Sequence, residues 1–322
     1  MKARSLGALA LLALIVALTP LLVRYPTLEA QMLISGLLAL GFSFLLGQMG
    51  FLSFGQATFN GIGAYAAALA LLHWHVPLVL LLAIGILAGT LSALVVGVLS
   101  IQGVGVYAVM LTFALNEMAY FSAFQLKGIT GGDNGLRGLI RPDLFGFSLS
   151  SSLTYYYLVA VVFVLAVYVV LRIIDSPFGH VLRAIRENEQ RAKAIGYEVR
   201  HFKIAAFALS GAISGLAGAL YALLYQFVPL EAIDFNTSTN IVIMGLLGGV
   251  GSPFGPILGA AIYTLLANFL SEVWARWPLV LGVIFCCIVL FLRGGLWELG
   301  PLALRRIRHL GGGNVAADSK PL

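Results

Sequence analysis

Long apolar runs recur along the whole chain, and they constrain its fold more than any other feature. Several windows of about 18 or more residues hold almost only apolar side chains, which is the length that a helix needs to cross a bilayer. Because lipid offers no hydrogen-bond partners, the backbone of each run must pair with itself in a helix. Composition agrees, since 60% of the 322 residues are hydrophobic and 10% are charged. The sequence therefore predicts an all-α polytopic membrane protein and excludes an ordinary soluble domain.

Ten apolar segments can be distinguished, and we expect each to be a transmembrane or re-entrant helix. They cover approximately residues 6–23, 31–46, 54–72, 76–101, 104–124, 153–174, 202–225, 237–247, 257–270 and 278–292. The first is long for a signal peptide and lacks a clean small-residue cleavage site, which predicts a retained N-terminal anchor helix in residues 1–30. Residues 31–295 are then expected to form the core and residues 296–322 a basic tail.

Lysine and arginine positions orient these segments. If the N-terminus is inside, ten crossings place 14 of the 19 Lys and Arg residues on the same side. This positive-inside bias predicts cytoplasmic N- and C-termini and explains the formal net charge of +6 without a nucleic-acid partner. The basic tail is expected to anchor on anionic membrane lipid rather than to form a dedicated binding site.

Residues 172–203 form the one long charged stretch. Ser176 and Pro177 are typical of a helix start, and Gly196 is suited to a helix end, so one amphipathic helix is expected over residues 181–195. Its apolar stripe is predicted to comprise Leu182, Ile185, Ala192 and Ile195. Three opposite-charge pairs are spaced for contact: Arg183/Glu187, Glu187/Arg191 and Glu189/Lys193. Because Glu189 also falls within the apolar stripe, we expect this helix to dock a protein outside the bilayer.

Two polar, glycine-rich breaks interrupt the apolar segments, at residues 47–53 and 248–256. Unwound backbone survives at membrane depth only where it lines a cavity or is buried in protein, so the breaks indicate a translocation pathway. The expected pathway residues are Gln48, Ser53, Gly55, Gln56, Asn60, Gly61, Gly63, Gly249 and Gly251. Their uncharged, amide-rich character suits a polar or zwitterionic solute. Close helix packing through small residues explains the region around Gly61 and Gly63 equally well, and it is the better reading of residues 210–215.

Other chemistry-bearing residues give weaker signals. Glu117 is either an intramembrane functional acid or an interfacial residue, and the second reading is slightly favoured. Cys286 and Cys287 are adjacent, so a disulfide between them is implausible and they read as small core residues. The chain has no metal-ligand spacing, no phosphate-binding loop and no catalytic constellation. We therefore expect no enzyme activity, no metal and no cofactor in this chain, and its membrane segments lack the acids and bases of a proton relay.

Several of these sequence motifs resemble those of a known protein family. Residues 175–189, continuing to 194–196, are similar to the cytoplasmic loop of branched-chain amino-acid ABC transporter permeases of the LivM type. Residues 55–65 resemble the family's signature after the second segment, although Asn60 stands where His is frequent. Residues 130–136 resemble its external loop, and residues 215–221 and 248–256 extend the similarity.

The resemblance implies a subunit of a bacterial inner-membrane importer. It would pair with a second, homologous permease, two cytoplasmic ATPases that use ATP, and a periplasmic solute-binding protein. The implied ATPase-coupling residues, within a loop over residues 175–201, are Arg183, Arg186, Glu187, Asn188, Glu189, Arg191 and Gly196. The implied contacts to the binding protein are Thr130, Gly131, Gly132 and Asn134. The general permease motif has a Glu where Gln190 stands here, so any carboxylate role passes to Glu187 or Glu189.

Alternatives remain open at this stage. The same importer class also carries urea, short amides or aromatic acids. An ion-coupled carrier or channel working alone is disfavoured by the charged loop and by the missing relay residues. A membrane-embedded enzyme or an assembly scaffold is disfavoured by the absence of a catalytic constellation.

Overall fold

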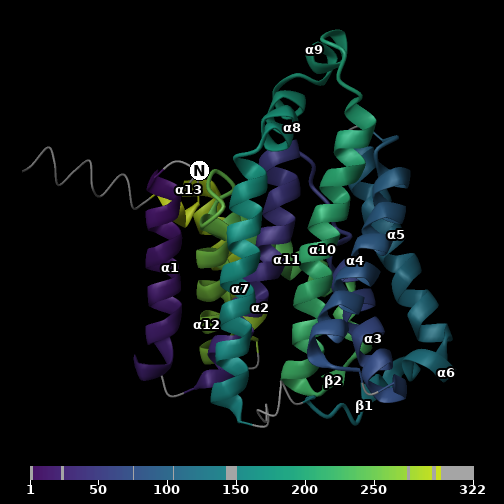
Figure 1. The fold of residues 1–322 in the computed structure, drawn as a ribbon, viewed down its shortest axis with the longest axis vertical. Coiled ribbons are helices and arrows are strands. Elements are labelled where there is room, and N and C mark those ends of the chain that lie inside the picture. The colour runs from purple at the N-terminus through teal and green to yellow at the C-terminus, as the bar shows by residue number, and fades with distance from the viewer. Residues whose placement is uncertain are drawn as a thin grey trace, which may run out of the picture.

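The computed structural model describes residues 3–22, 25–74, 76–103, 105–142, 151–273, 276–291 and 295–298. Within them the long helices are α1 (Ala3–Leu22), α2 (Pro26–Phe44), α3 (Gln56–Trp74), α4 (Leu78–Ser100), α5 (Val106–Gln125), α7 (Ser152–Ile174), α10 (Val199–Tyr225), α11 (Phe235–Gly248), α12 (Gly255–Val273) and α13 (Trp277–Phe291) (Figure 1). The short elements are the π-helix η1 (Leu45–Met49), α6 (Lys127–Thr130), η2 (Gly132–Asn134), β1 (Leu136–Arg137), α8 (Pro177–Glu187), α9 (Glu189–Ala194), β2 (Phe227–Val228), η3 (Leu230–Ile233) and η4 (Leu296–Glu298).

Each of the ten predicted apolar segments coincides with one long helix, and the chain is an all-α multi-pass membrane protein. Five described helices are long and apolar enough to cross a membrane: Pro26–Met49, Leu78–Ser100, Ser152–Ile174, Val199–Tyr225 and Gly255–Val273. That all ten segments cross remains a prediction. The predicted boundary between anchor and core at residue 30 falls inside α2, which begins at Pro26 because proline is favoured in a first helical turn. Most of the predicted basic tail, residues 299–322, lies outside the described residues.

The centre of the bundle is α10, which packs along α3 and α4. Small residues permit this packing, because a Cβ atom added to Gly63 would lie 2.6 Å from the Cα of Gly215. One added to Gly89 would lie 2.5 Å from the carbonyl oxygen of Gly211. Backbones that approach this closely exclude any side chain, which is how membrane helices gain packing energy without a hydrophobic driving force. The packing interpretation of residues 210–215 is confirmed.

Two helices begin beside each other inside the bundle. After η1 the chain runs without helix through residues 50–55 and then enters α3, while residues 226–234 lead from α10 into α11. The Ser238 hydroxyl in the first turn of α11 accepts a hydrogen bond from Ala57 N at 3.0 Å and donates to Phe54 O at 2.5 Å. The starts of α3 and α11 are therefore joined directly, each after a stretch of irregular backbone.

The polar elements lie at the two ends of the bundle. Figure 1 shows α8 and α9 projecting from one end, which is also the end where α1 begins. At the other end lie α6 and the two-stranded antiparallel sheet, in which Leu136 pairs with Val228. The charged stretch and the loop predicted to be external are thus at opposite ends of the molecule.

Candidate coupling and translocation site

The charged stretch contains two helices, which corrects the prediction of one helix over residues 181–195. Ser176 begins α8, accepting a hydrogen bond from Gly179 N at 3.4 Å, and Pro177 occupies the first turn. At Asn188 the backbone becomes extended, with φ −158° and ψ 100°. The Asn188 side chain then caps α9 by accepting a hydrogen bond from Arg191 N at 2.9 Å. Asparagine competes with the helical backbone for such bonds, so it serves as a cap better than as an interior residue.

The underside of α8 and α9 is apolar, as expected, but the stripe is shorter. Leu182, Ile185 and Ala192 are buried, whereas Ile195 is 71% exposed. The bend at Asn188 changes the direction of the second helix, so the 3.6-residue periodicity does not continue to Ile195. Phe178 of α8 also stacks on Phe202 of α10, with 5.7 Å between the ring centroids. Apolar packing therefore fixes α8 on the bundle.

One of the three predicted ion pairs is present among the described residues. Glu189 contacts Lys193 at 2.9 Å and also contacts Lys203 of α10 at 2.7 Å. Partial burial raises the pKa of Glu189, but hydrogen bonds from Lys203 and Lys193 outweigh this effect and hold its pKa below the ordinary 4.5. Glu189, which the sequence places within the apolar stripe, thus connects α9 to α10 through its ion pair with Lys203.

The arginines of α8 use backbone carbonyls instead of Glu187. Arg183 Nη2 donates to Ile174 O at 2.9 Å, at the end of α7. Arg186 Nη1 donates to Gly47 O in η1, and its side chain lies against Gly50, whose φ is +72°. Carbonyls near a helix end lack partners within the helix, which makes them acceptors for arginine. Arg186 therefore links the charged loop directly to the break after α2.

A cavity of about 560 Å³ with a mixed polar and apolar lining lies under this loop. Its lining includes residues 49–52 from the end of η1 onward, Gly103, Gly105 and Val106 around the start of α5, and Arg186 to Glu189 with Lys203. The predicted coupling residues Arg186, Glu187, Asn188 and Glu189 are thus gathered beside the first glycine-rich break. Arg191 and Gly196 lie at the exposed tip, and Gly196 has φ +98°, consistent with the predicted helix end.

Predicted pathway residues on α3 cross-link helices in the middle of the bundle. Gln56 is buried; its Nε2 donates to Ser210 at 3.0 Å and its Oε1 accepts from Ser214 at 2.8 Å, both on α10. Ser210 in turn donates to Gly41 O of α2 at 2.9 Å. Ser53 is buried and accepts from Gly55 N at 3.1 Å. These side chains hold the break in place through uncharged hydrogen bonds.

Two other predicted pathway residues keep unused polar atoms. The Oε1 atom of Gln48 and the Oδ1 atom of Asn60 are buried without a partner among the described residues. Asn60 lines a second cavity of about 300 Å³, together with Gln31, Glu231 and Asn240. Buried polar atoms without partners are uncommon, so both are candidates to bind a solute or water.

The predicted glycines fall into two groups. A Cβ atom at Gly61 or Gly63 would collide with η3 or α10, so these two are packed against neighbouring backbone. Gly249, with φ +94°, lies in the turn between α11 and α12, where Gly251 has open space. Gly55 has ordinary contacts at 3.4 Å. That any of them lines a solute pathway remains a prediction.

The predicted external loop is ordered by its own backbone geometry. Thr130 is buried; its hydroxyl donates to Ala123 O at 2.6 Å and accepts from Gly132 N at 3.2 Å. Gly131 and Gly132 have φ of +76° and +59°, a region that glycine enters at low cost. Asn134 is exposed. The loop therefore presents a defined surface at the end opposite α8 and α9.

Several polar residues of the site were missed by sequence reasoning. Asn116 and Ser238 are fully buried and hydrogen-bonded to the start of α3, where Asn116 Oδ1 accepts from Thr58 Oγ1 at 2.7 Å. The sequence feature that could have identified them is an uncharged polar residue within an apolar segment.

Glu29 lies within α2, and its exposed fraction is 4%. The second predicted apolar segment starts after Glu29, because a charged residue lowers the local hydropathy. Glu117 is only partly buried. Cys286 and Cys287 are exposed, so the prediction that they are core residues is wrong; an apolar run does not show which of its residues face outward. In the described residues no cluster suits a metal ion.

The sequence is similar to several named permease proteins. The sequence is 28% identical over 318 residues to the high-affinity branched-chain amino acid transport system permease protein LivM of Escherichia coli K12, covering 91% of this chain and 75% of that protein. It is 27% identical to the LivM protein of Salmonella typhimurium, over 81% of this chain and 67% of that one. The autoinducer 2 import system permease protein LsrC of Escherichia coli O9:H4 is 28% identical over 173 residues, 51% of this chain and 48% of LsrC.

No solved structure gave a significant match. The family described as branched-chain amino acid transport system / permease component matches residues 27–292, from the start of α2 to the end of α13. That interval contains the loop of α8 and α9, both glycine-rich breaks and the loop at the opposite end. The chain therefore belongs to the branched-chain amino acid transport permease family and is of the LivM type.

Proposed function

We propose that this chain is a transmembrane subunit of an ATP-driven, binding-protein-dependent importer of leucine-, isoleucine- and valine-type amino acids. It forms the pathway with a second, homologous permease, and two cytoplasmic ATPases hydrolyse ATP. It lies in the bacterial inner membrane with both termini in the cytoplasm. The observation that carries the proposal is the loop of α8 and α9, which leaves the bundle at one end and is fixed by Arg186 to the break after α2.

Coupling proceeds through that contact. The ATPases hold the tip of α8 and α9, and their closure moves the loop as a unit because α8 is packed on α10 and Glu189 is tied to Lys203. Arg186 transmits the movement to η1 and residues 50–55, which face the start of α3. Differential contact of the ATPases with two states of the loop is what drives alternating access.

The solute path suits a small zwitterion. The binding protein docks on Thr130, Gly131, Gly132 and Asn134 and releases the solute at that end. The cavity lined by Asn60 receives it, where the amides of Gln31, Asn60 and Asn240 pair with the ammonium and carboxylate. Glu231 adds a negative charge for the ammonium. The choice of branched-chain amino acids follows from the LivM relatives, since polar amides alone do not distinguish among zwitterions.

Co-purification tests the assembly. The tagged chain, extracted in mild detergent from its native cells, is expected to bring down a second permease and two ATPases identified by mass spectrometry. Proteoliposomes of this complex should take up labelled leucine only with ATP and the binding protein. A chain that purifies alone and still transports would refute the proposal and favour an ion-coupled carrier.

Asn188 gives a sharper test of the loop. The Asn188→Ala change removes the cap of α9, whereas Asn188→Asp retains a capping oxygen, so only the alanine variant is expected to lose ATPase association, by about tenfold. A Glu187→Lys/Glu189→Lys variant should lose it as well. Retained association and uptake in the double variant would show that the ATPases bind elsewhere.

A further inference from the structure

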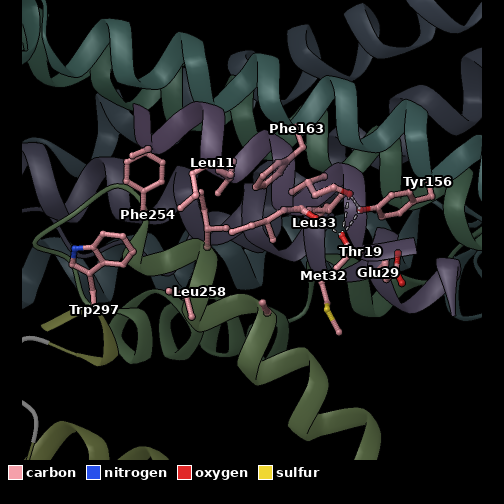
Figure 2. Close-up of a pocket in the computed structure, with 16 residues that line it drawn as sticks. Leu11, Thr19, Glu29, Met32, Leu33, Tyr156, Phe163, Phe254, Leu258 and Trp297 are labelled. Atoms are coloured by element: carbon pink, nitrogen blue, oxygen red, sulfur yellow. Dashed lines mark hydrogen bonds between the residues drawn. The ribbon is translucent and has the colours of Figure 1, made fainter. Parts of the chain in front are cut away.

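A groove lies on the side of the bundle where α1 meets α2, α7 and α12. Its volume is about 380 Å³, and its walls are almost entirely apolar, including Leu11, Leu33 and Phe163 (Figure 2). Along α1 it extends from Ala8 to Thr19, a distance of about 16 Å at the helical rise per residue. It belongs neither to the cavity under α8 and α9 nor to the cavity at Asn60, and its shape suits a hydrocarbon chain.

One end of this groove holds a buried carboxylate. Glu29 is 4% exposed, and neither of its oxygens has a hydrogen-bond partner among the described residues. The hydroxyl groups beside it in Figure 2 are already engaged, since Tyr156 donates to Val16 O at 2.5 Å and Thr19 donates within α1. The first turn of α2 offsets only part of the cost of the charge. A buried carboxylate without a counter-ion is unfavourable, so a cationic group from outside the described residues would stabilise Glu29 in its charged form.

We propose that the groove binds a phospholipid with a primary-amine headgroup, that is, phosphatidylethanolamine. Its ammonium donates hydrogen bonds to Glu29, and one acyl chain lies along α1 toward Phe254 and Trp297. Glu29 is one turn inside the start of α2, which places it at headgroup depth and leaves the apolar length of the groove in the hydrocarbon region. Charge and hydrogen bonding together select this lipid, because phosphatidylglycerol carries no cation and the quaternary ammonium of phosphatidylcholine has no N–H to donate.

Native mass spectrometry of the full-length protein tests this site. Detergent-solubilised protein is titrated with dioleoyl-phosphatidylethanolamine, dioleoyl-phosphatidylglycerol or dioleoyl-phosphatidylcholine. Wild-type protein is expected to retain phosphatidylethanolamine at least tenfold more than Glu29→Gln. The matched control is Glu272→Gln, the same change at an exposed position of α12, which should behave as wild type.

A second variant tests the groove without altering the charge. Ala261→Phe fills the groove from α12 and should reduce phosphatidylethanolamine retention while Glu29 is intact. Equal retention by wild type and Glu29→Gln, or equal retention of all three lipids by wild type, would overturn the proposal. Arg24, which lies outside the described residues, is the nearest base in the sequence. Binding that appears only in Arg24→Gln would assign the carboxylate to Arg24 and would likewise overturn the proposal.

Discussion

Asn116 joins three parts of the fold through one side-chain amide. Its Oδ1 accepts from Thr58 N at 3.1 Å and from Thr58 Oγ1 at 2.7 Å, and its Nδ2 donates to Ile233 O at 2.9 Å. It therefore pairs with the backbone N–H of Thr58 in the first turn of α3 and with the carbonyl of Ile233 at the end of η3, positions where the helix itself leaves backbone groups unpaired. At the scale of single residues, such amides hold irregular backbone inside the bundle.

Replacing Asn116 by alanine should destabilise the protein. The change leaves buried groups of Thr58 and Ile233 unpaired, and we expect a loss of roughly 1–3 kcal/mol in the free energy of unfolding. Thermal unfolding in detergent measures the effect. Ser122→Ala, on an exposed turn of the same helix, is the control and should change stability little. Equal stability of the two variants would show that Asn116 does not support the break.

The Glu189 pair predicts a dependence of stability on pH. The pKa of Glu189 is lower in the folded protein than the ordinary 4.5. The ion pair therefore stabilises the folded state above pH 4.5, and this stabilisation is lost as pH falls through the folded pKa. The contribution should be below about 1 kcal/mol, because the carboxylate side chain is 39% exposed and screened by solvent. Hydrogen exchange of residues 189–194 measures it: wild type should exceed Glu189→Gln in protection at pH 7, and the difference should decrease as the pH is lowered below 4.5 through the folded pKa. A difference that does not change as the carboxylate is titrated would contradict the ion-pair explanation.

At the scale of elements, the seam between α4 and α10 determines how the helices pack. Gly89 and Gly215 lie in backbone contact, so Gly89→Ala must push the helices apart or strain them, at a cost of roughly 1–3 kcal/mol. Gly282→Ala on α13 is the control, because its added Cβ would meet no atom within 4 Å. Thermal unfolding should show a lower Tm for the first variant only. The same Tm for both would mean that the seam is not closely packed.

The broken helices form the second feature at this scale. The first turns of α3 and α11 lie beside each other, with Gln56, Ala57 and Ser238 buried, and Ser238 joins them. Uncharged serine and asparagine side chains satisfy part of the backbone there, close in sequence to the carboxylates of Glu231 and Asp234.

At the scale of the molecule, the two polar ends predict opposite accessibility. In a background of Cys286→Ser and Cys287→Ser, Ile195→Cys should react with a membrane-impermeant maleimide only from the cytoplasmic face, in inside-out vesicles. Asn134→Cys should react only from the outer face, in spheroplasts. Both positions are exposed at opposite ends of the bundle. Labelling of both from one side would contradict the arrangement in Figure 1.

The sequence by itself determined the class of fold and the approximate position of each long helix that the structure describes. Uninterrupted apolar runs leave the backbone no alternative to helices in lipid, and ten such runs gave ten helices. It also indicated the charged stretch and both glycine-rich breaks, because charge and glycine stand out against an apolar background. These properties depend on local composition, which a single chain displays directly.

Only the tertiary structure decided which partners the charged, polar and glycine residues of these segments contact. The link from Arg186 to Gly47 and the pairing of Glu189 with Lys203 join residues that periodicity treats as unrelated. The same holds for Gly61 and Gly63, which pack against backbone distant in sequence, and for Glu29, which hydropathy placed outside its helix. Long-range packing selects the partner of each polar group, and no local pattern encodes that choice.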